Sequence, residues 1–133
     1  MIKAVLDTNI IVSSLLAPGP PAVIADLVAN GRMIPIYNDK ILEEYEDVLS
    51  RKKFDFSPLH IIRLIETITK AGMAFERKPP SKIKMIDDDD RVFYDTAVQA
   101  KAYLITGNIK HFPLQPYIVT PARFLQICYK TEK

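Results

Sequence analysis

Side chains with oxygen ligands recur in this sequence at places where a metal-dependent site could form. They are Asp7, Glu44, the run Asp87–Asp90 and Asn108. Carboxylates that meet in one place repel each other unless a cation neutralises them. Hard oxygen ligands suit Mg²⁺ or Mn²⁺, and such a metal activates water and stabilises charge on a phosphoryl group. These residue types therefore point to metal-dependent phosphoryl chemistry.

Each of these acids also has a simpler structural interpretation. Asp7 could cap the helix that follows it, because aspartate is a favoured N-cap residue. Glu44 has three acidic neighbours between positions 43 and 47, which is typical of an exposed helix face. Asp87–Asp90 could be a solvated turn whose charges favour the positive end of a helix dipole. Residue type alone leaves both interpretations open.

The elements that would position these residues alternate between strands and helices. Short apolar, β-branched runs predict strands. They lie at 2–6, 33–37, 103–106 and 117–120, with one further short strand near 74–76. Amphipathic spacing, Pro-Pro starts and Gly stops predict the helices. They lie at 8–16, 20–29, 39–51, 58–71, from the run 87–90 to about 100, and at 121–129.

This alternation predicts an α/β domain with a mostly parallel central sheet. In such a sheet, ligands bind outside the carboxyl ends of the strands, and the helices that cross back begin at that same edge. Asp7 and Asn108 each follow a predicted strand, and Glu44 lies early in the helix after the second strand. We therefore expect these residues and Asp87–Asp90 to gather at one edge.

Composition sets limits on the class of protein. The 133 residues are 48% hydrophobic and 26% charged, so we expect one globular domain, 1–133. The net charge of +2 and the pI near 8.6 permit nucleic-acid binding without requiring it. A single cysteine, Cys128, excludes an intramolecular disulfide framework and fits a reducing compartment. We find no secretory leader or membrane-length apolar run, so we expect a cytoplasmic protein.

Five segments in order along the chain resemble the PIN-domain family, in its VapC-like toxin and ribonuclease branch. They are LDTNI at 6–10, ILEEYEDVLSR at 41–51, DDDDRVFYDTA at 87–97, YLITGNIKHFP at 103–113 and VTPARFL at 119–125. The resemblance implies a three-layer α/β/α fold with a four- to five-stranded sheet. It also implies a Mg²⁺- or Mn²⁺-dependent endoribonuclease, often the toxin of a toxin–antitoxin pair.

Carried over by motif, the resemblance assigns the metal to Asp7, Glu44 and Asp90. The small hydroxyl residue of the closing motif falls on Thr106. Family nucleases commonly have a fourth aspartate where this chain has Asn108. An amide oxygen is a weaker ligand than a carboxylate, so a second metal position would be weakened. One metal on the three remaining acids would still permit hydrolysis of RNA.

Further residues extend this predicted site. Asp87 or Asp95 could compensate for the missing acid. Asp95, however, lies roughly 140° around a regular helix from Asp90, so both reach one site only if Asp90 caps the helix. We expect Asn9 to brace Asp7.

Two cations and one histidine complete the predictions near the site. Lys110 or Arg91 could contact the scissile phosphate, with exposed surface charge as the equal alternative. His111 lies in a predicted loop, and we interpret it as structural, with substrate contact as the alternative. It has no metal-ligand spacing to His60, the other histidine of the chain.

The expected partners are single-stranded or structured RNA, a small antitoxin protein and a second copy of the chain. The amphipathic segments 39–51 and 58–71 could supply the dimer face, although core packing explains them as well. One alternative is a catalytically weakened PIN-like module that binds RNA or regulates. Another is a haloacid-dehalogenase-like phosphatase, but that class needs an acid two residues after Asp7, where this chain has Asn9.

Overall fold

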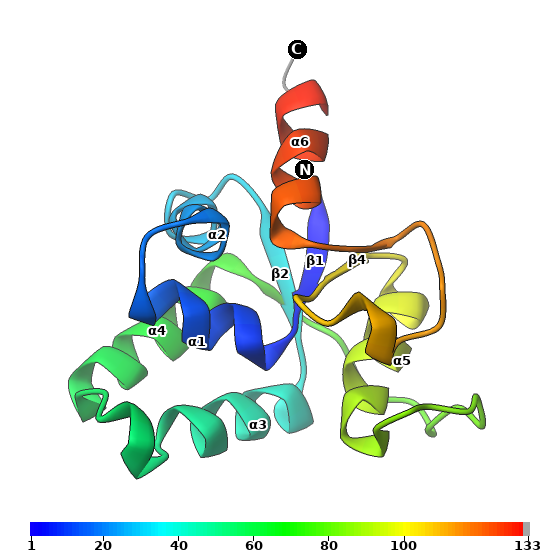
Figure 1. Ribbon diagram of the computed structural model, residues 1–133, viewed down its shortest axis with the longest axis horizontal. Coiled ribbons are helices and arrows are strands. Elements are labelled where there is room, and N and C mark those ends of the chain that lie inside the picture. The colour runs from blue at the N-terminus through cyan, green and yellow to red at the C-terminus, as the bar shows by residue number, and fades with distance from the viewer. Residues whose placement is uncertain (132–133) are drawn as a thin grey trace.

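A five-stranded sheet runs through the middle of the molecule in the computed structural model, which describes residues 1–131 (Figure 1). The strand order is β3-β2-β1-β4-β5, and every neighbouring pair is parallel. The strands are β1 Lys3–Leu6, β2 Ile34–Tyr37, β3 Met73–Ala74, β4 Tyr103–Ile105 and β5 Ile118–Val119. The predicted domain 1–133 includes two residues, 132 and 133, that lie outside the described residues.

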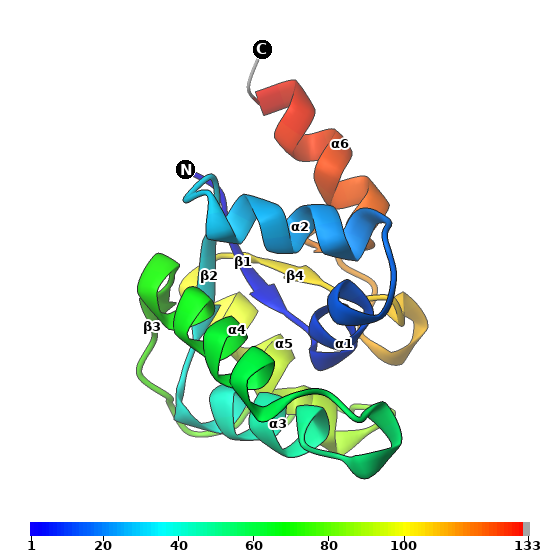
Figure 2. The same ribbon diagram turned by 90° about the vertical axis from the view of Figure 1, so that its left-hand side faces the viewer.

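Helices cover both faces of this sheet, which confirms the predicted three-layer α/β/α fold. They are α1 Thr8–Leu16, α2 Pro20–Ala29, α3 Asp39–Leu49, α4 Pro58–Ala71, α5 Arg91–Ala100 and α6 Pro121–Thr131. Helix α5 packs on β1, β2 and β4 from one side, whereas α4 packs on β2 from the other side together with α2 (Figures 1 and 2). Helix α3 lies below the sheet edge and contacts α1, α4 and α5.

The central strand β1 explains why a short apolar run ends in an acid. Ala4, Val5 and Leu6 are at most 2% exposed, because helices cover both faces of the strand. The predicted strands all form, although each is slightly shorter than expected, and Met33 lies just outside β2. The chain leaves the sheet at Asp7, which places this carboxylate at the carboxyl edge.

Two features position helix α3 in the fold: its N-cap residue and the buried ring of Tyr45. Asn38 caps the helix, with its Oδ1 accepting the Ile41 N–H at 2.9 Å. Tyr45 is 1% exposed, and its hydroxyl donates to the Leu6 carbonyl at 2.5 Å. The Tyr45 ring also packs against Phe93 of α5. Helix α3 is therefore fixed against the end of β1, one residue before Asp7.

Gly72 lets α4 turn directly into β3. A Cβ atom at this position would collide with the backbone oxygens of Pro35 and Ile68. The close approach of α4 to β2 thus requires a residue without a side chain at the helix end.

The acidic run differs from the helical start that its sequence predicts. Asp88–Asp90 form a separate 3₁₀ turn, η2, ahead of α5. The cause is local: Asp87 Oδ1 accepts the Asp89 N–H at 3.0 Å, which favours a tight turn over a regular helix. Asp90 consequently occupies the N-cap position of α5. Two further 3₁₀ turns, η1 Lys52–Phe54 and η3 Ile109–His111, lie in segments predicted as loops.

No single helix within residues 1–131 is long and apolar enough to cross a membrane. Helices α1 and α2 pass that test only when taken together, and a bend of 99° separates them. Ile10 and Ile11 of α1 and Ile24 and Val28 of α2 belong to the hydrophobic core.

Candidate active site

Asp7 lies at the carboxyl edge of the sheet, held by the neighbouring strand. Its backbone N–H donates to the Ile105 carbonyl at 3.0 Å, which continues the pairing of β1 with β4. The residue is 5% exposed, and its Oδ2 accepts the Thr106 hydroxyl at 2.7 Å. Asp7 occupies the N-cap position of α1, but its side chain makes no capping hydrogen bond. The side-chain hydrogen bond of the carboxylate therefore goes to the residue that follows β4.

Thr106 connects this carboxylate to the loop after β4. It is fully buried, and its Oγ1 also accepts the Asn108 N–H at 3.0 Å. One hydroxyl thus donates to Asp7 and accepts from the loop, which fixes both in place. The Asn108 side chain is exposed, so this residue enters the arrangement through its backbone.

Asp90 approaches the same edge from the start of α5. Its side chain is 18% exposed, and its Oδ2 lies 3.9 Å from Nδ1 of His111, in η3. The carboxylates of Asp90 and Asp7 also interact electrostatically, because the charge of Asp7 acts on Asp90. Of the predicted acids, these are the two that the structure brings together.

Both carboxylates hold their protons more tightly than usual. Burial raises the pKa of Asp7, against the lowering effects of the Thr106 hydroxyl, the Thr8 and Asn9 amides and the charge of His111. Burial, followed by the charges of Asp7 and Asp87, raises the pKa of Asp90 to about 6. Two ionised acids at this position repel each other, and a bound cation would relieve that repulsion.

Glu44 is the predicted acid on α3. It is half-buried on α3, whereas the neighbouring Glu43 is exposed. Burial, followed by the charges of Asp89 and Asp47, raises the pKa of Glu44. Neither Asp7 nor Asp90 is among the groups that act on it. Glu44, the half-buried acid of these two, faces the part of the molecule between α3 and α5.

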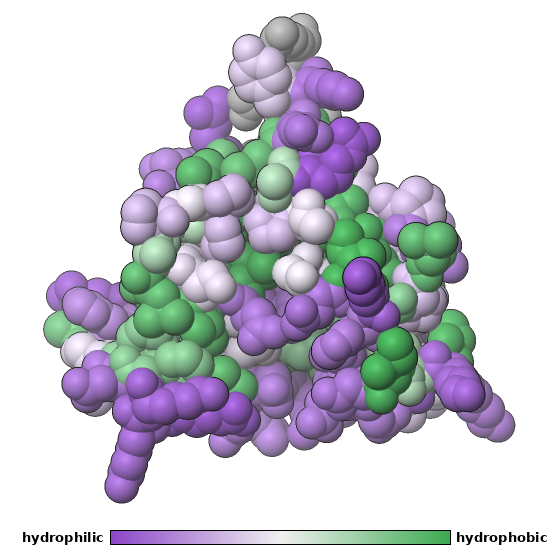
Figure 3. Space-filling view, in the orientation of Figure 1, coloured by the Kyte–Doolittle hydropathy of each residue, from purple (hydrophilic) through white to green (hydrophobic). Residues whose placement is uncertain are grey.

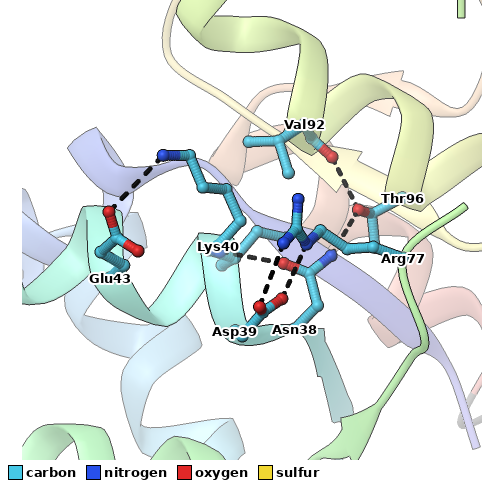
Figure 4. Close-up of polar contacts among 8 residues, drawn as sticks. Asn38, Asp39, Lys40, Glu43, Arg77, Val92 and Thr96 are labelled. Carbon is cyan, nitrogen blue, oxygen red and sulfur yellow. Dashed lines mark hydrogen bonds and ion pairs between the residues drawn. The ribbon is translucent and has the colours of Figure 1, made fainter. Parts of the chain in front are cut away.

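That part is a groove of about 390 Å³ between α3, α5 and the connector from β3 to α5. Most charges around it are paired. Arg77 donates two hydrogen bonds to Asp39, at 2.7 and 3.1 Å, and Lys40 pairs with Glu43 at 3.5 Å (Figure 4). The groove is therefore lined by side chains of both signs, unlike the edge that holds Asp7.

A buried polar bridge holds the two helices of this groove at a fixed separation. The Asn38 amide donates to the Thr96 hydroxyl at 2.9 Å, and that hydroxyl donates to the Val92 carbonyl at 2.6 Å (Figure 4). The same asparagine caps α3, so one side chain sets both the start of α3 and its contact with α5.

Arg91 and Asp95 hold the connector that precedes α5. Asp95 is 8% exposed, and its Oδ2 accepts the Ser81 N–H at 2.9 Å. Arg91 donates to the carbonyls of Ser81 and Ile83, at 2.9 and 2.6 Å, and pairs with Asp88 at 2.8 Å. In this structure Asp95 does not face Asp90, and the Arg91 guanidinium is occupied by the connector. Their predicted roles as a metal ligand and a phosphate contact stay predictions.

The remaining predicted residues lie around the pair without a direct side-chain contact to it. The Asn9 side chain is exposed, and only its backbone amide acts on Asp7. The Asp87 carboxylate is used in its own turn, although its charge reaches Asp90. Lys110 is exposed in η3, one residue before His111.

His111 is the residue that sequence reasoning undervalued. It had no partner at a metal-binding spacing, and its loop offered no periodicity from which to place its side chain. The available signal was its position three residues after Asn108, within one turn of the carboxyl edge. The structure places it beside Asp90, where its charge also acts on Asp7.

The donor set at this edge fits a hydrated divalent cation only in part. Among residues 1–131, no group of three or more His, Cys, Asp or Glu side chains lies close enough to hold a metal ion. Mg²⁺, however, commonly uses one or two carboxylates together with waters and substrate phosphates. Asp7 and Asp90 could supply those two. The Thr8 hydroxyl, next to Asp7, is buried with no protein partner among the described residues, which leaves an oxygen available for a water or an ion.

Comparison with known proteins now places this arrangement in a family. Residues 3–110 match the family model described as "PIN domain". The chain is 29% identical over 121 residues to Ribonuclease VapC19 from two strains of Mycobacterium tuberculosis, covering 87% of this chain and 97% of the relative. It is 30% identical over 112 residues to an uncharacterised protein of Methanocaldococcus jannaschii, covering 80% and 71%. No solved structure matches the chain. The resemblance read from the five motifs is thus confirmed, and the chain belongs to the PIN domain family.

Proposed function

We propose that this protein is an endoribonuclease that hydrolyses RNA phosphodiester bonds with Mg²⁺ or Mn²⁺, and that it is the toxin of a toxin–antitoxin pair. One observation carries the proposal: Asp7 follows β1 and Asp90 caps α5 at the carboxyl edge of the sheet, where the charge of Asp7 helps to raise the pKa of Asp90 to about 6. The name of the relative, Ribonuclease VapC19, supports the same substrate class. The cytoplasm, which contains RNA, is the proposed location.

In this proposal each residue of the edge has a defined task. Asp7 and Asp90 hold the cation, and Glu44 reaches it through water. The cation, when bound, activates water and stabilises charge on the phosphate. Thr106 orients Asp7 through its 2.7 Å hydrogen bond, and the exposed Asn108 side chain is free to contact substrate or water. Lys110, from the same loop, contacts the RNA backbone.

The test is cleavage of single-stranded RNA with Mg²⁺ or Mn²⁺, for the wild type and Asp7→Asn. Changing an outer partner of a metal ligand typically costs 10- to 100-fold, so we expect loss of the ligand itself to cost more than about 100-fold. Asp26→Asn, at an exposed position of α2, is the matched control and should retain wild-type activity. Equal rates for the wild type and Asp7→Asn would refute the site.

A second function, an RNA-binding or regulatory module without catalysis, is favoured by two observations. Asn108 stands where family nucleases commonly have an acid, and neither Asp7 nor Asp90 is among the groups that act on Glu44. Such a module would retain RNA in a filter-binding assay but show no turnover with either metal. Metal-dependent turnover by the wild type would exclude it.

The proposed protein partners are an antitoxin and a second copy of the chain. Apolar surface lies over α1 and α4 (Figure 3). Leu16 of α1 and Leu59 and Ile62 of α4 are each more than half exposed. A groove of about 490 Å³ lies beside them, lined in part by Phe56 and Ile65. Covering this face would remove exposed apolar area from water, whichever of the two partners binds there.

A further inference from the structure

His111 occupies a fixed position at the mouth of the acidic edge. Its backbone N–H donates to the Asn108 carbonyl at 2.9 Å, and this bond closes the turn η3. The next residue, Phe112, is 7% exposed and anchors the turn in the core. The imidazole itself is about half exposed, so a rigid turn presents it to solvent.

The His111 ring lies near both acids, and its hydrogen-bonding groups are not engaged by either of them. Its Nδ1 is 3.9 Å from Asp90 Oδ2, which is too long for a hydrogen bond. The ring therefore lies beside Asp90, and its charge lowers the pKa of both Asp90 and Asp7. The half of the side chain that stays exposed leaves a ring edge open to a ligand.

A phosphate that enters this edge needs hydrogen-bond donors, because it brings negative charge next to two carboxylates. The neighbouring guanidinium of Arg91 already donates to Ser81, Ile83 and Asp88. The Thr106 hydroxyl is fully buried and donates to Asp7. Lys110 and Asn108 are exposed in the same loop, but His111 is the donor that a distance of 3.9 Å to Asp90 places beside the pair.

We propose that His111 is a catalytic residue that donates a hydrogen bond to a non-bridging oxygen of the scissile phosphate. This inference rests on the proposed RNA hydrolysis and adds to it a contact with the reacting group. His111 also supplies a polar contact at the loop where this chain has Asn108 in place of an acid. A neutral imidazole has one N–H donor and an imidazolium has two, so the contact does not depend on one charge state.

The experiment measures single-turnover cleavage of one RNA with Mn²⁺ at saturating protein, for the wild type, His111→Ala, His111→Gln and His60→Ala. His60 is exposed on α4 and serves as the matched histidine control. We expect His111→Ala to slow cleavage by roughly tenfold to a hundredfold, the usual effect of losing one hydrogen bond to a charged group. His111→Gln keeps a donor and should recover part of the rate, and His60→Ala should match the wild type. Circular dichroism and thermal unfolding confirm that each variant is folded.

A second measurement separates contact with the phosphate from a purely structural role. Sulfur replaces each non-bridging oxygen of the scissile phosphate in turn, which weakens a hydrogen bond to that oxygen. For one of the two stereoisomers, we expect the sulfur to slow the wild type more than it slows His111→Ala. The same slowing in both proteins, for both stereoisomers, would overturn the proposed contact even if His111→Ala is slow.

The outcomes also distinguish this inference from the function on which it rests. If the wild type cleaves RNA and His111→Ala cleaves it equally fast, the role of His111 is refuted while the nuclease function stands. If the wild type shows no metal-dependent cleavage of any RNA tested, the nuclease function is refuted, and the role of His111 with it.

Discussion

Two acidic regions of this protein have similar residue types but differ in whether their acids are paired with arginines. At the sheet edge, Asp7 is buried and Asp90 is partly buried, and the charge of Asp7 raises the pKa of Asp90. In the groove between α3 and α5, Asp39 pairs with Arg77 and Asp88 pairs with Arg91. Exposed ion pairs of the second kind contribute little to stability. Whether the fold pairs the acids of a segment with a cation therefore says more about a site than how many acids the segment contains.

The strongest test of this comparison removes one acid from each region. Asp90→Asn should lower the rate of RNA cleavage by more than about 100-fold, because it removes one of two direct ligands. Glu44→Gln should lower it by only about tenfold, because we place Glu44 behind a water. Rates measured at several Mn²⁺ concentrations would separate weaker metal binding from slower chemistry. If both variants lose activity equally, the two regions form one site and the comparison fails.

Thr106→Val should lower cleavage by about 10- to 100-fold, the usual cost of removing a partner that orients a ligand. The variant keeps the shape of the side chain but leaves Asp7 Oδ2 and the Asn108 N–H without the buried hydroxyl. Thr106→Ser is the matched control, since it retains the hydroxyl and should stay close to the wild type. A fully active Thr106→Val would show that Asp7 needs no such support.

Within the groove, Asn38→Ala should lower the free energy of unfolding by about 1–2 kcal/mol, because it removes a helix cap and leaves the Thr96 bridge unmade. Arg77→Ala breaks an exposed ion pair at the same end of α3 and should leave stability close to that of the wild type. Urea denaturation of both variants measures the difference. A larger loss for Arg77→Ala would reverse the proposed balance between buried and exposed contacts.

The smallest expected effect is a pH dependence of stability that belongs to Asp90. Its pKa is about 6 in the folded protein and 3.8 without the fold, so the folded state binds the proton more tightly. Asp90 therefore contributes stability that is fully present below pH 3.8 and is lost as the pH rises through about 6. Its partial exposure keeps this contribution small.

Urea midpoints measured with a chelator at about pH 4 and about pH 7 would show the effect as a difference between the wild type and Asp90→Asn. The variant should lose less stability than the wild type on going to the higher pH. Asp26→Asn should follow the wild type. Added Mg²⁺ should stabilise the wild type more at the higher pH, where Asp90 is ionised.

Much of this architecture could be predicted from sequence because local physics specifies it. The strand before Asp7 and the strand that ends near Thr106 follow from residue type and spacing, and both formed as expected. Those same signals placed Asp7 and Asp90 at one edge.

Other parts depend on chain paths that no periodicity encodes. Ser81 captures Asp95 through a backbone amide, and nothing in the residue type of Ser81 indicates that contact. The position of His111 depends on a 3₁₀ turn three residues long. Glu44 was assigned through the family resemblance, and helical spacing does not say which cavity it faces.

The attachment of Ser81 also has a consequence for how the molecule fluctuates. The connector from 75 to 87 forms no regular secondary structure, yet one of its amides is held by a carboxylate that is itself buried. In hydrogen–deuterium exchange, Ser81 should stand out as a slowly exchanging site in a rapidly exchanging stretch. Its exchange rate would then report how often α5 releases the connector.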